Sequence, residues 1–379
     1  MKSTSSVVSI ILALSLLACS HAPAPKRLAY SQELQDVLDT ALKATGGTGV
    51  SAAVIVAGKG EWAGVSGMSE PETGAAIKPD MLFDIASVGK TYVAALVLQL
   101  AEEGRLTLDD PLPKWLPDFP NVNNTATIRQ LLNHTSGNSH FAENSAYWQT
   151  VMGDLDSLWT HEAVLAFVPE PKFPPGQGWH YSSANYVLLG MIIEKATAST
   201  LATQLRNRIF IPLTLNNTCT PLDRDAALCG TLAHAHFDVN GDGKLDDMGN
   251  MPRTSIFSSV WASGPVISTA EDLAQWADAL YRGRVLKKQS LDQMLDFHRP
   301  TPGEPLISGY GLGASEFPGE LFGGEKAWGH LGWNPGYMTA MLYFPDRSVT
   351  LTVLINDNNE GCITQIAVGL WSAVKNHLE

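Results

Sequence analysis

The pattern of apolar and polar residues changes twice along the chain, and these changes predict how the protein is organised. Residues 31–44 have the pattern of a helix and are followed by Gly46 and Gly47, which are typical helix-ending residues. Residues 50–67 read as two strands joined by a tight turn at 58–60. The start of the chain therefore predicts one helix followed by a hairpin.

The last third of the chain again has a strand pattern. Three apolar segments read as strands, at residues 326–332, 337–344 and 349–356. A helix at residues 364–377 closes the chain. Before them, residues 268–281 predict a helix that opens with a capping box from Ser268 to Glu271.

Between these regions, residues 106–251 are mostly helical in pattern, with long loops. Because strands lie at both ends and helices in the middle, we predict an α/β (α+β) fold. Residues 31–105 and 252–379 would form a sheet domain, and residues 106–251 would form a helical domain inserted into it. A site between two such domains is a natural place for a ligand.

The segment "FDIASVGKTYVAALVLQL", residues 83–100, predicts a helix with an unusual lysine. From Val88 onward nearly every residue is apolar or small on all sides, which is typical of a buried helix. Lys90 nevertheless lies in the first turn, three residues after Ser87. An ammonium group buried without a partner is costly, so a functional reason for this lysine is expected.

Ser87 and Lys90 lie three residues apart and therefore share one face of the helix. A serine hydroxyl is a weak nucleophile unless a base takes its proton. Burial disfavours the charged form of lysine, so a buried Lys90 can become that base at neutral pH. The free N–H groups at the helix start can also stabilise an anion near Ser87. The pair predicts nucleophilic catalysis by serine.

The same spacing occurs a second time, from Ser372 to Lys375. This copy lies late in the closing helix, where its lysine can reach solvent. We interpret it as a surface pair.

Two further segments carry candidate chemistry. Tyr181 comes just before an apolar helix in "WHYSSANYVLLG" and, near an ammonium group, could serve as a second base or proton carrier. His330 and Gly332 lie on a presumed strand in "WGHLGWNPGY". His330 could donate a hydrogen bond to a substrate, and Gly332 would let a substrate lie close to the backbone. The alternatives are a packing tyrosine and a structural histidine.

Composition narrows the function classes. The chain has 379 residues, 45% hydrophobic and 17% charged, which is ordinary for a globular protein. Its net charge of -13 and the absence of basic runs argue against nucleic acid and against electrostatic binding to anionic lipid.

The first residues read as a targeting segment. Lys2 precedes an apolar run at 7–17 that is too short to span a bilayer and predicts a signal peptide over residues 1–18. The run ends in "LLACS", which resembles a bacterial lipobox with Cys19 as the lipidated residue. Residues 19–30 would then be a tether, and the protein would be exported and anchored in the periplasm or at the outer membrane by lipid alone. The alternative is an ordinary signal peptide with a discarded cysteine.

The other cysteines have separate explanations. Cys219 and Cys229 lie close together in the sequence and could pair in an oxidising periplasm, or both could stay as thiols. Cys362 has no obvious partner and reads as a small buried hydrophobic residue.

A calcium-like motif lies in the middle of the chain. Asp238, Asn240, Asp242 and Gly243 match the first half of a calcium-binding loop. The twelfth position is Gly249 instead of glutamate. Either a structural calcium ion or a solvated acidic turn fits this pattern. No catalytic metal and no required cofactor are implied.

Several sequence blocks, in order, resemble the serine β-lactamase and penicillin-binding protein superfamily. The likeness is greatest to the group of class C β-lactamases, D-alanyl-D-alanine carboxypeptidases and esterases. It runs from about Ser31 to the end of the chain. It is carried by "FDIASVGKTYVAALVLQLAEEGRLTLDDPLPKWLPDF", "TIRQLLNHTSGN", "YSSANYVLLG", "ISTAEDLAQWADAL", "YGLG" and "GHLGWNPGY".

This resemblance implies a penicillin-recognising fold, with an antiparallel sheet flanked by helices plus a helical domain. It implies Ser87 as the acylated nucleophile, Lys90 as its proton partner and Tyr181 as general base. His330 and Gly332 would stand at the third motif of the family. The oxyanion would lie between the backbone N–H groups of Ser87 and Trp333.

Two departures from the family pattern bear on the substrate. Ser183 takes the position of a common asparagine, and its shorter side chain would hold a substrate carbonyl less well. His330 replaces the lysine of class C β-lactamases and, mostly neutral at pH 7, attracts a substrate carboxylate less strongly.

We therefore expect a secreted serine hydrolase that acts through a Ser87 acyl-enzyme on a small-molecule or peptide substrate. A carboxypeptidase-like or esterase-like activity fits better than a class C-type β-lactamase. An alternative of another class is a non-catalytic lipoprotein that binds cell-wall peptide. The sequence leaves the exact substrate and the oligomeric state open.

Overall fold

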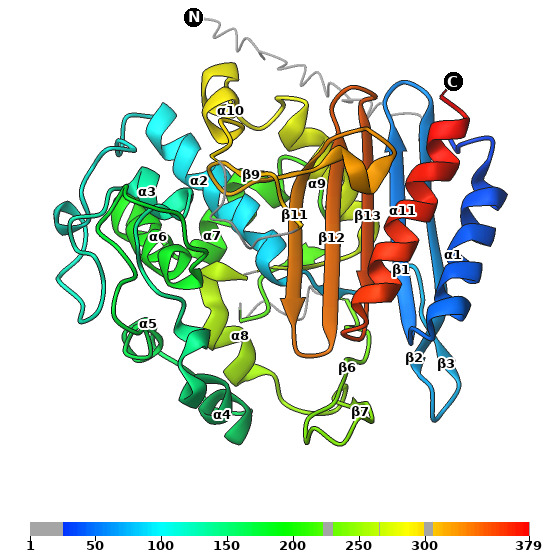
Figure 1. Ribbon diagram of the computed structural model, residues 1–379, viewed down its shortest axis with the longest axis horizontal. Helices are drawn as coiled ribbons and strands as arrows, with labels where there is room; N and C mark the ends of the chain where they lie inside the picture. Colours follow the sequence, from blue (N-terminus) through cyan, green and yellow to red (C-terminus); the bar gives the residue numbers. More distant parts are fainter. Residues whose placement is uncertain (1–25, 223–229, 265, 299–305, 379) are drawn as a thin grey trace, which may run out of the picture.

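The computed structural model describes residues 26–222, 230–264, 266–298 and 306–378. An eight-stranded antiparallel sheet is its centre (Figure 1). The strand order is β3 (Ala75–Ala76), β2 (Gly60–Glu70), β1 (Gly49–Val56), β13 (Val349–Ile355), β12 (Tyr337–Phe344), β11 (Ala327–Asn334), β10 (Ser315–Phe317) and β9 (Gly309–Tyr310). The start and the end of the chain thus meet at the β1–β13 pair, as the strand pattern predicted.

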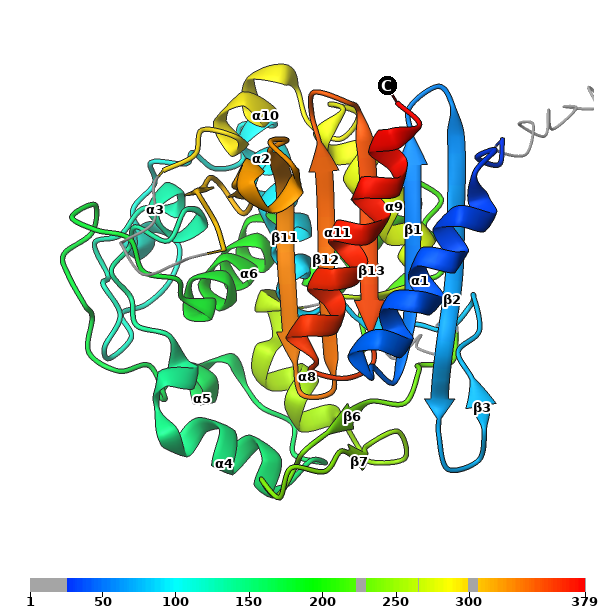
Figure 2. The same ribbon diagram turned by 45° about the vertical axis from the view of Figure 1, so that its right-hand side comes forward.

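Helices cover both faces of the sheet. On one face lie α1 (Ser31–Thr45) and α11 (Glu360–Asn376), side by side (Figure 2). Helix α1 ends at Gly46 in a left-handed conformation, with φ 70°, as the sequence predicted. On the other face, α9 (Ala270–Tyr281) lies against β1, β12 and β13. Each face buries its own apolar core.

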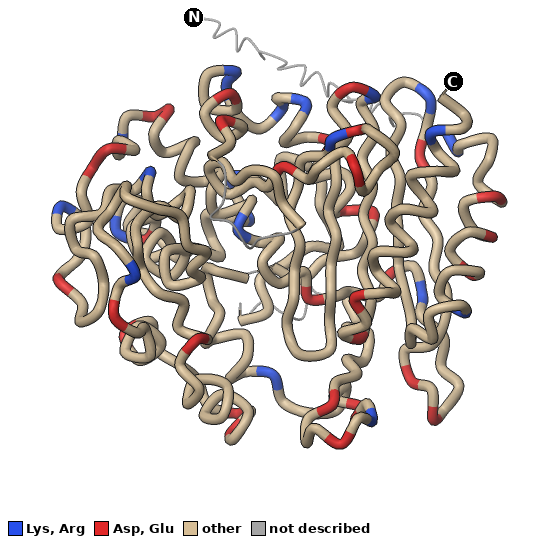
Figure 3. Tube along the Cα trace, viewed as in Figure 1, with Lys and Arg blue, Asp and Glu red and all other residues tan. Residues whose placement is uncertain are grey.

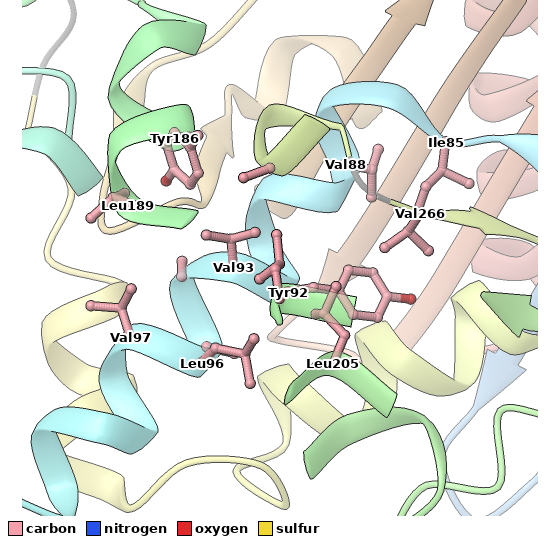
Figure 4. Close-up of a cluster of buried hydrophobic side chains, with 14 of the residues drawn as sticks. Ile85, Val88, Tyr92, Val93, Leu96, Val97, Tyr186, Leu189, Leu205 and Val266 are labelled. Carbon is pink, nitrogen blue, oxygen red and sulfur yellow. The ribbon is translucent and has the colours of Figure 1, made fainter. Parts of the chain in front are cut away.

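The division of the chain into a sheet domain and a helical domain stays a prediction, and the packing of one helix bears on it. Helix α2 (Lys90–Glu102) was assigned to the sheet domain, yet it packs among α6 (Ser183–Thr197) and α7 (Leu201–Leu205) (Figure 4). Its apolar surface explains this, because only a position enclosed by other elements buries all of its sides.

The remaining elements are short. The helices are α3 (Ile128–Leu132), α4 (Ser145–Gly153), α5 (His161–Leu165), α8 (Thr254–Val260) and α10 (Lys288–Met294). Two small sheets also form, from β4 (Phe83–Asp84), β8 (Ile267–Ser268) and β5 (Thr218–Cys219), and from β6 (His236–Phe237) and β7 (Asp246–Asp247).

Two local predictions need correction. The N-cap of α9 is Thr269, whose side chain accepts from the N–H of Asp272, and not Ser268. Ser268 instead pairs with Phe83 in the β4–β8 ladder, which keeps its backbone extended. The predicted tether also ends earlier than residue 30, because Leu28 is buried and its N–H donates to the carbonyl of Glu61.

The cysteine predictions fall partly within the described residues. Cys219 is disulfide-bonded, and Cys229, its expected partner, lies outside the described residues. Cys362 is free and buried, as predicted. The signal peptide and Cys19 also lie outside the described residues. Within the described ranges, no helix is both long and apolar enough to cross a membrane.

Candidate active site

Ser87 and Lys90 meet where a short 3-10 helix, η1 (Ala86–Gly89), passes into α2. The Nζ atom of Lys90 lies 3.0 Å from the Ser87 Oγ atom and 2.7 Å from the carbonyl oxygen of Ser263. Lys90 has no exposed surface, whereas Ser87 is half-buried and lines a pocket. The predicted pairing of nucleophile and buried lysine is therefore present.

Burial decides the charge of Lys90. Loss of hydration lowers its pKa well below the ordinary value of 10.5. The described residues show no carboxylate in an ion pair with it. A neutral amine can donate one hydrogen to the Ser263 carbonyl and still offer its lone pair to the Ser87 hydroxyl. The geometry therefore suits removal of the Ser87 proton by Lys90.

The backbone just before Ser87 is held in an uncommon conformation. Ala86 has φ 47°, a left-handed value that is unfavourable for a residue with a Cβ atom. The Asp84 carboxylate accepts from the Ala86 N–H at 2.8 Å and, with its other oxygen, from the Asn334 amide at 2.8 Å. Asp84 thus connects residues 85–87, which we call the nucleophile turn, to the end of β11.

Asp84 was missed in the sequence analysis. Its signal was an acidic residue between Phe83 and Ile85, in a segment otherwise apolar. The side chain is 1% exposed, and burial raises its pKa against the opposing effects of the Arg253 charge and of its hydrogen bonds. A buried carboxylate with two structural partners indicates a positioning residue.

Replacing Asp84 tests this role. We expect Asp84→Ala to lower kcat by about tenfold to a hundredfold, since a displaced nucleophile loses alignment. KM should change much less. Asp84→Asn should be milder, because its carbonyl oxygen can still accept from the Ala86 N–H. Steady-state kinetics on one ester substrate would check this order. A rise in KM as large as the fall in kcat would contradict the positioning role.

Gly332 has a structural role besides the predicted one. A Cβ atom at this position would lie 2.2 Å from the carbonyl oxygen of Ile85 and 3.3 Å from the Cβ atom of Ala86. The space that a side chain would occupy at Gly332 is therefore filled by the backbone that precedes Ser87. Gly332 itself lines the pocket around Ser87, and close approach of substrate to its backbone stays a prediction. The glycine brings β11 against the nucleophile turn.

His330 also differs from its predicted role as a hydrogen-bond donor to substrate. Its Nδ1 atom lies 2.6 Å from the Leu331 carbonyl oxygen, and its Nε2 atom lies 3.0 Å from the Tyr310 hydroxyl. The carbonyl can only accept, so Nδ1 carries the hydrogen. Burial lowers the His330 pKa to about 3, with a smaller contribution from Lys90. His330 is thus a neutral residue with both ring nitrogens already engaged.

Tyr181 lies beside Lys90, as predicted. The Nζ atom of Lys90 is 5.1 Å from the centre of the Tyr181 ring, and Tyr181 lines the same pocket as Ser87. The ring also contacts His134, at a centroid distance of 4.4 Å. His134 was missed in the sequence analysis, although it lies in the quoted block "TIRQLLNHTSGN". Its Nδ1 atom lies 3.2 Å from the backbone N–H of Ser182, which fixes the segment that carries Tyr181.

The pocket around Ser87 has a volume of about 520 Å³ and is mostly apolar. Trp333 lines it and is 41% exposed, and the role of its backbone N–H in holding an oxyanion stays a prediction. Ser183 is buried at the start of α6 and is not among the described lining residues. Contact between Ser183 and substrate stays a prediction.

The calcium-like motif forms an exposed loop between β6 and β7. Both carboxylate oxygens of Asp238 accept backbone N–H groups, including those of Gly241 and Gly243. The Asn240 and Asp242 side chains likewise accept from the backbone of the loop. No cluster of three His, Cys, Asp or Glu residues suited to a metal ion occurs in the described part of the chain. Calcium binding here stays a prediction.

The second Ser-x-x-Lys copy is a surface feature, as interpreted. Ser372 is exposed, and the Lys375 Nζ atom donates to the carbonyl of Gly323 at 3.0 Å. It lies on α11, which packs against the sheet on the face opposite α9.

Comparison with known proteins identifies the family. The sequence model described as Beta-lactamase matches residues 34–365. Penicillin-binding protein 4* of Bacillus subtilis (strain 168) is 29% identical over 75% of this chain and 62% of that protein. Esterase EstB of Burkholderia gladioli is 36% identical over 43% of this chain and 45% of the esterase. The chain thus spans less than two thirds of the length of these two relatives.

A solved structure extends the likeness over nearly the whole fold. The D-amino acid amidase from Ochrobactrum anthropi SV3, complexed with L-phenylalanine, has a TM-score of 0.80 and 27% identity. The match covers 92% of this chain and 99% of the amidase chain. With its β-lactamase-like sheet and helices, this chain belongs to the Beta-lactamase family and is a serine hydrolase of that family.

Proposed function

We propose that this protein hydrolyses uncharged esters or amides through an acyl-enzyme on Ser87. Lys90 takes the Ser87 proton as the hydroxyl attacks the substrate carbonyl, and the backbone N–H groups of Ser87 and Trp333 receive the oxyanion. Tyr181, beside Lys90, donates its proton to the leaving group and receives the proton that Lys90 took from Ser87, so both residues return to their starting forms. Water then attacks the acyl-enzyme by the same proton path and releases the acid.

The observation that carries the choice of an uncharged substrate concerns the described lining of the pocket, which holds no lysine or arginine. Glu360 is the charged member of this lining. His330 is neutral, with both ring nitrogens engaged. A substrate carboxylate would lose its hydration there without gaining a partner, which is unfavourable.

The names of two known relatives support hydrolysis of esters and amides, and they do not decide the charge of the substrate. One is an esterase and another is a D-amino acid amidase. A carboxypeptidase acting on D-alanyl-D-alanine, or a β-lactamase, would have to bind a substrate carboxylate. The described pocket offers less to such a substrate, which places these two activities second.

A matched pair of substrates tests the proposal. Phenyl acetate and 4-acetoxybenzoate present the same acyl group, but only the second has a carboxylate. We expect kcat/KM to favour phenyl acetate by about tenfold or more, the order expected when a buried charge is left unpaired. Ser87→Ala is the control and should remove both activities. Faster turnover of 4-acetoxybenzoate, or of a D-alanyl-D-alanine peptide, would sink the proposal.

Export of the protein as a lipoprotein also remains a proposal. It is supported by the apolar run at 7–17 and by Cys19 in "LLACS". Fatty-acid labelling in a bacterial host should disappear in Cys19→Ser, and labelling that persists in this variant would contradict it.

A further inference from the structure

Trp333 is unusual among the aromatic residues of the fold because its side chain is 41% exposed. Two other aromatic rings meet it edge to face. Trp148 of α4 lies at a centroid distance of 6.0 Å, and Phe237 of β6 lies at 6.2 Å. Three elements far apart in the sequence thus build one aromatic cluster, which leaves a face of Trp333 open to the pocket.

An apolar wall continues from this cluster. Met338 is the cross-strand partner of Trp333 on β12, and it lines the same pocket. Ile363 and Val368 of α11 line the pocket as well. Side chains that are apolar, and that come from rigid strands and helices, form a surface suited to an apolar group.

Trp333 is also next to the reacting centre. Its neighbour Gly332 lies against the backbone of Ile85, two residues before Ser87. Successive side chains on a strand point to opposite faces, so the indole leaves β11 on the side away from His330 and Gly332. Ser87 nevertheless lines the same pocket as Trp333, so a group that reaches the indole can belong to the same substrate molecule whose carbonyl faces Ser87.

Charge and polarity restrict what this group can be. Figure 3 shows Lys and Arg scattered over the fold, and none of the described lining residues is a lysine or an arginine. A sugar ring could also stack on an indole, but it needs several hydrogen-bonding side chains around its hydroxyl groups. Trp148, Phe237, Met338 and Ile363 supply little of that kind.

We propose that the Trp333 side chain is the main wall of a subsite that binds an aromatic group of the substrate, next to the scissile carbonyl. This inference rests on the proposed function and adds the substrate class. Binding of the substrate's aromatic ring is favourable because it removes exposed indole surface from water and adds an edge-to-face contact with Trp333. The subsite selects substrates through affinity and alignment, and takes no part in proton transfer.

The test compares two pairs of neutral esters. The acyl side is varied with 4-nitrophenyl acetate and 4-nitrophenyl 3-phenylpropionate, and the alcohol side with ethyl acetate and benzyl acetate. The wild-type protein should favour the aryl member of at least one pair in kcat/KM. In Trp333→Ala this preference should fall by about tenfold or more, the order expected for lost apolar contacts in a pocket. Any loss common to both members of a pair cancels in the ratio.

A matched control is Leu158→Ala, which removes an exposed apolar side chain outside the described lining of the pocket. It should leave the preference unchanged. An unchanged preference in Trp333→Ala would overturn the subsite, while hydrolysis of the esters would leave the proposed function intact.

A binding measurement separates the two proposals. In Ser87→Ala, which cannot form the acyl-enzyme, calorimetry should detect 3-phenylpropanamide, and the signal should be lost when Trp333→Ala is added. Binding that survives this second change would refute the subsite whatever the ester rates. Ester turnover that survives Ser87→Ala would refute the proposed function and not the subsite.

Discussion

Replacing Lys90 with methionine will nearly abolish hydrolysis and will also make the folded protein more stable at pH 7. Lys90→Met removes the amine that lies 3.0 Å from the Ser87 Oγ atom, so the loss in kcat should be about a hundredfold to ten-thousandfold. Methionine has a similar length and no charge. It should raise the free energy of unfolding by roughly 1 to 4 kcal/mol, because folding no longer requires a lysine to lose its proton and its hydration.

The stability gain has a defined pH dependence. Burial lowers the folded-state pKa of Lys90 well below 10.5. Between the lowered pKa and 10.5, the unfolded chain binds a proton that the folded chain does not, so wild-type stability rises with pH through this window. Lys90→Met lacks this slope, and its advantage should shrink as the pH approaches 10.5. Denaturant unfolding at several pH values, together with ester kinetics, would measure both effects.

Lys375→Met is the matched control for Lys90→Met. It makes the same substitution in the second Ser-x-x-Lys copy, where the lysine donates to Gly323 at the surface. Activity and stability should both remain close to wild type. An active Lys90→Met variant would remove Lys90 from the proton path, and an active but destabilised variant would give it a purely structural role.

Gly332→Ala is the second change with a large expected effect. The new Cβ atom would lie 2.2 Å from the Ile85 carbonyl oxygen, which is backbone and cannot rotate away. Either β11 or the nucleophile turn must move. We expect a loss of about 1–3 kcal/mol in the free energy of unfolding, as for an overpacked core. Moving Ser87 by as little as ~1 Å should cost about a hundredfold in kcat.

Gly153→Ala provides the control for this substitution. Gly153 lies at the end of α4, has no positive φ and would place its Cβ atom in open space. It should leave kcat and stability nearly unchanged. A folded Gly332→Ala variant with wild-type kcat would show that the contact between β11 and the nucleophile turn does not set the position of Ser87.

The contact between Ser87 and Lys90 could be predicted because its signal is local. A lysine in an apolar helix is costly unless it has a use, and the spacing of three places Ser87 on the same face. The strands at both chain ends could be predicted for a similar reason, because their apolar patterns are continuous. The neighbours of α2 could not be predicted in the same way. The local pattern indicates that a helix is buried, but it does not indicate which elements enclose it.

The roles of Gly332 and His330 depend on contacts between distant segments. Gly332 lies against the Ile85 carbonyl, although more than two hundred residues separate the two in the sequence. The sequence alone does not indicate which backbone a glycine on a strand will contact. His330 is engaged by Tyr310 and by its own neighbour Leu331. Those bonds exist only once the strands have assembled, so sequence alone left His330 as a donor to substrate.

The most direct test of the account is the intact mass of the soluble protein, from Lys26 onward, quenched in acid during turnover of 4-nitrophenyl 3-phenylpropionate. The account predicts a population whose mass is increased by one phenylpropionyl group, carried by the peptide that contains Ser87 and absent in Ser87→Ala. Steady turnover with no adduct on Ser87, or with the adduct on another residue, would contradict the Ser87 acyl-enzyme.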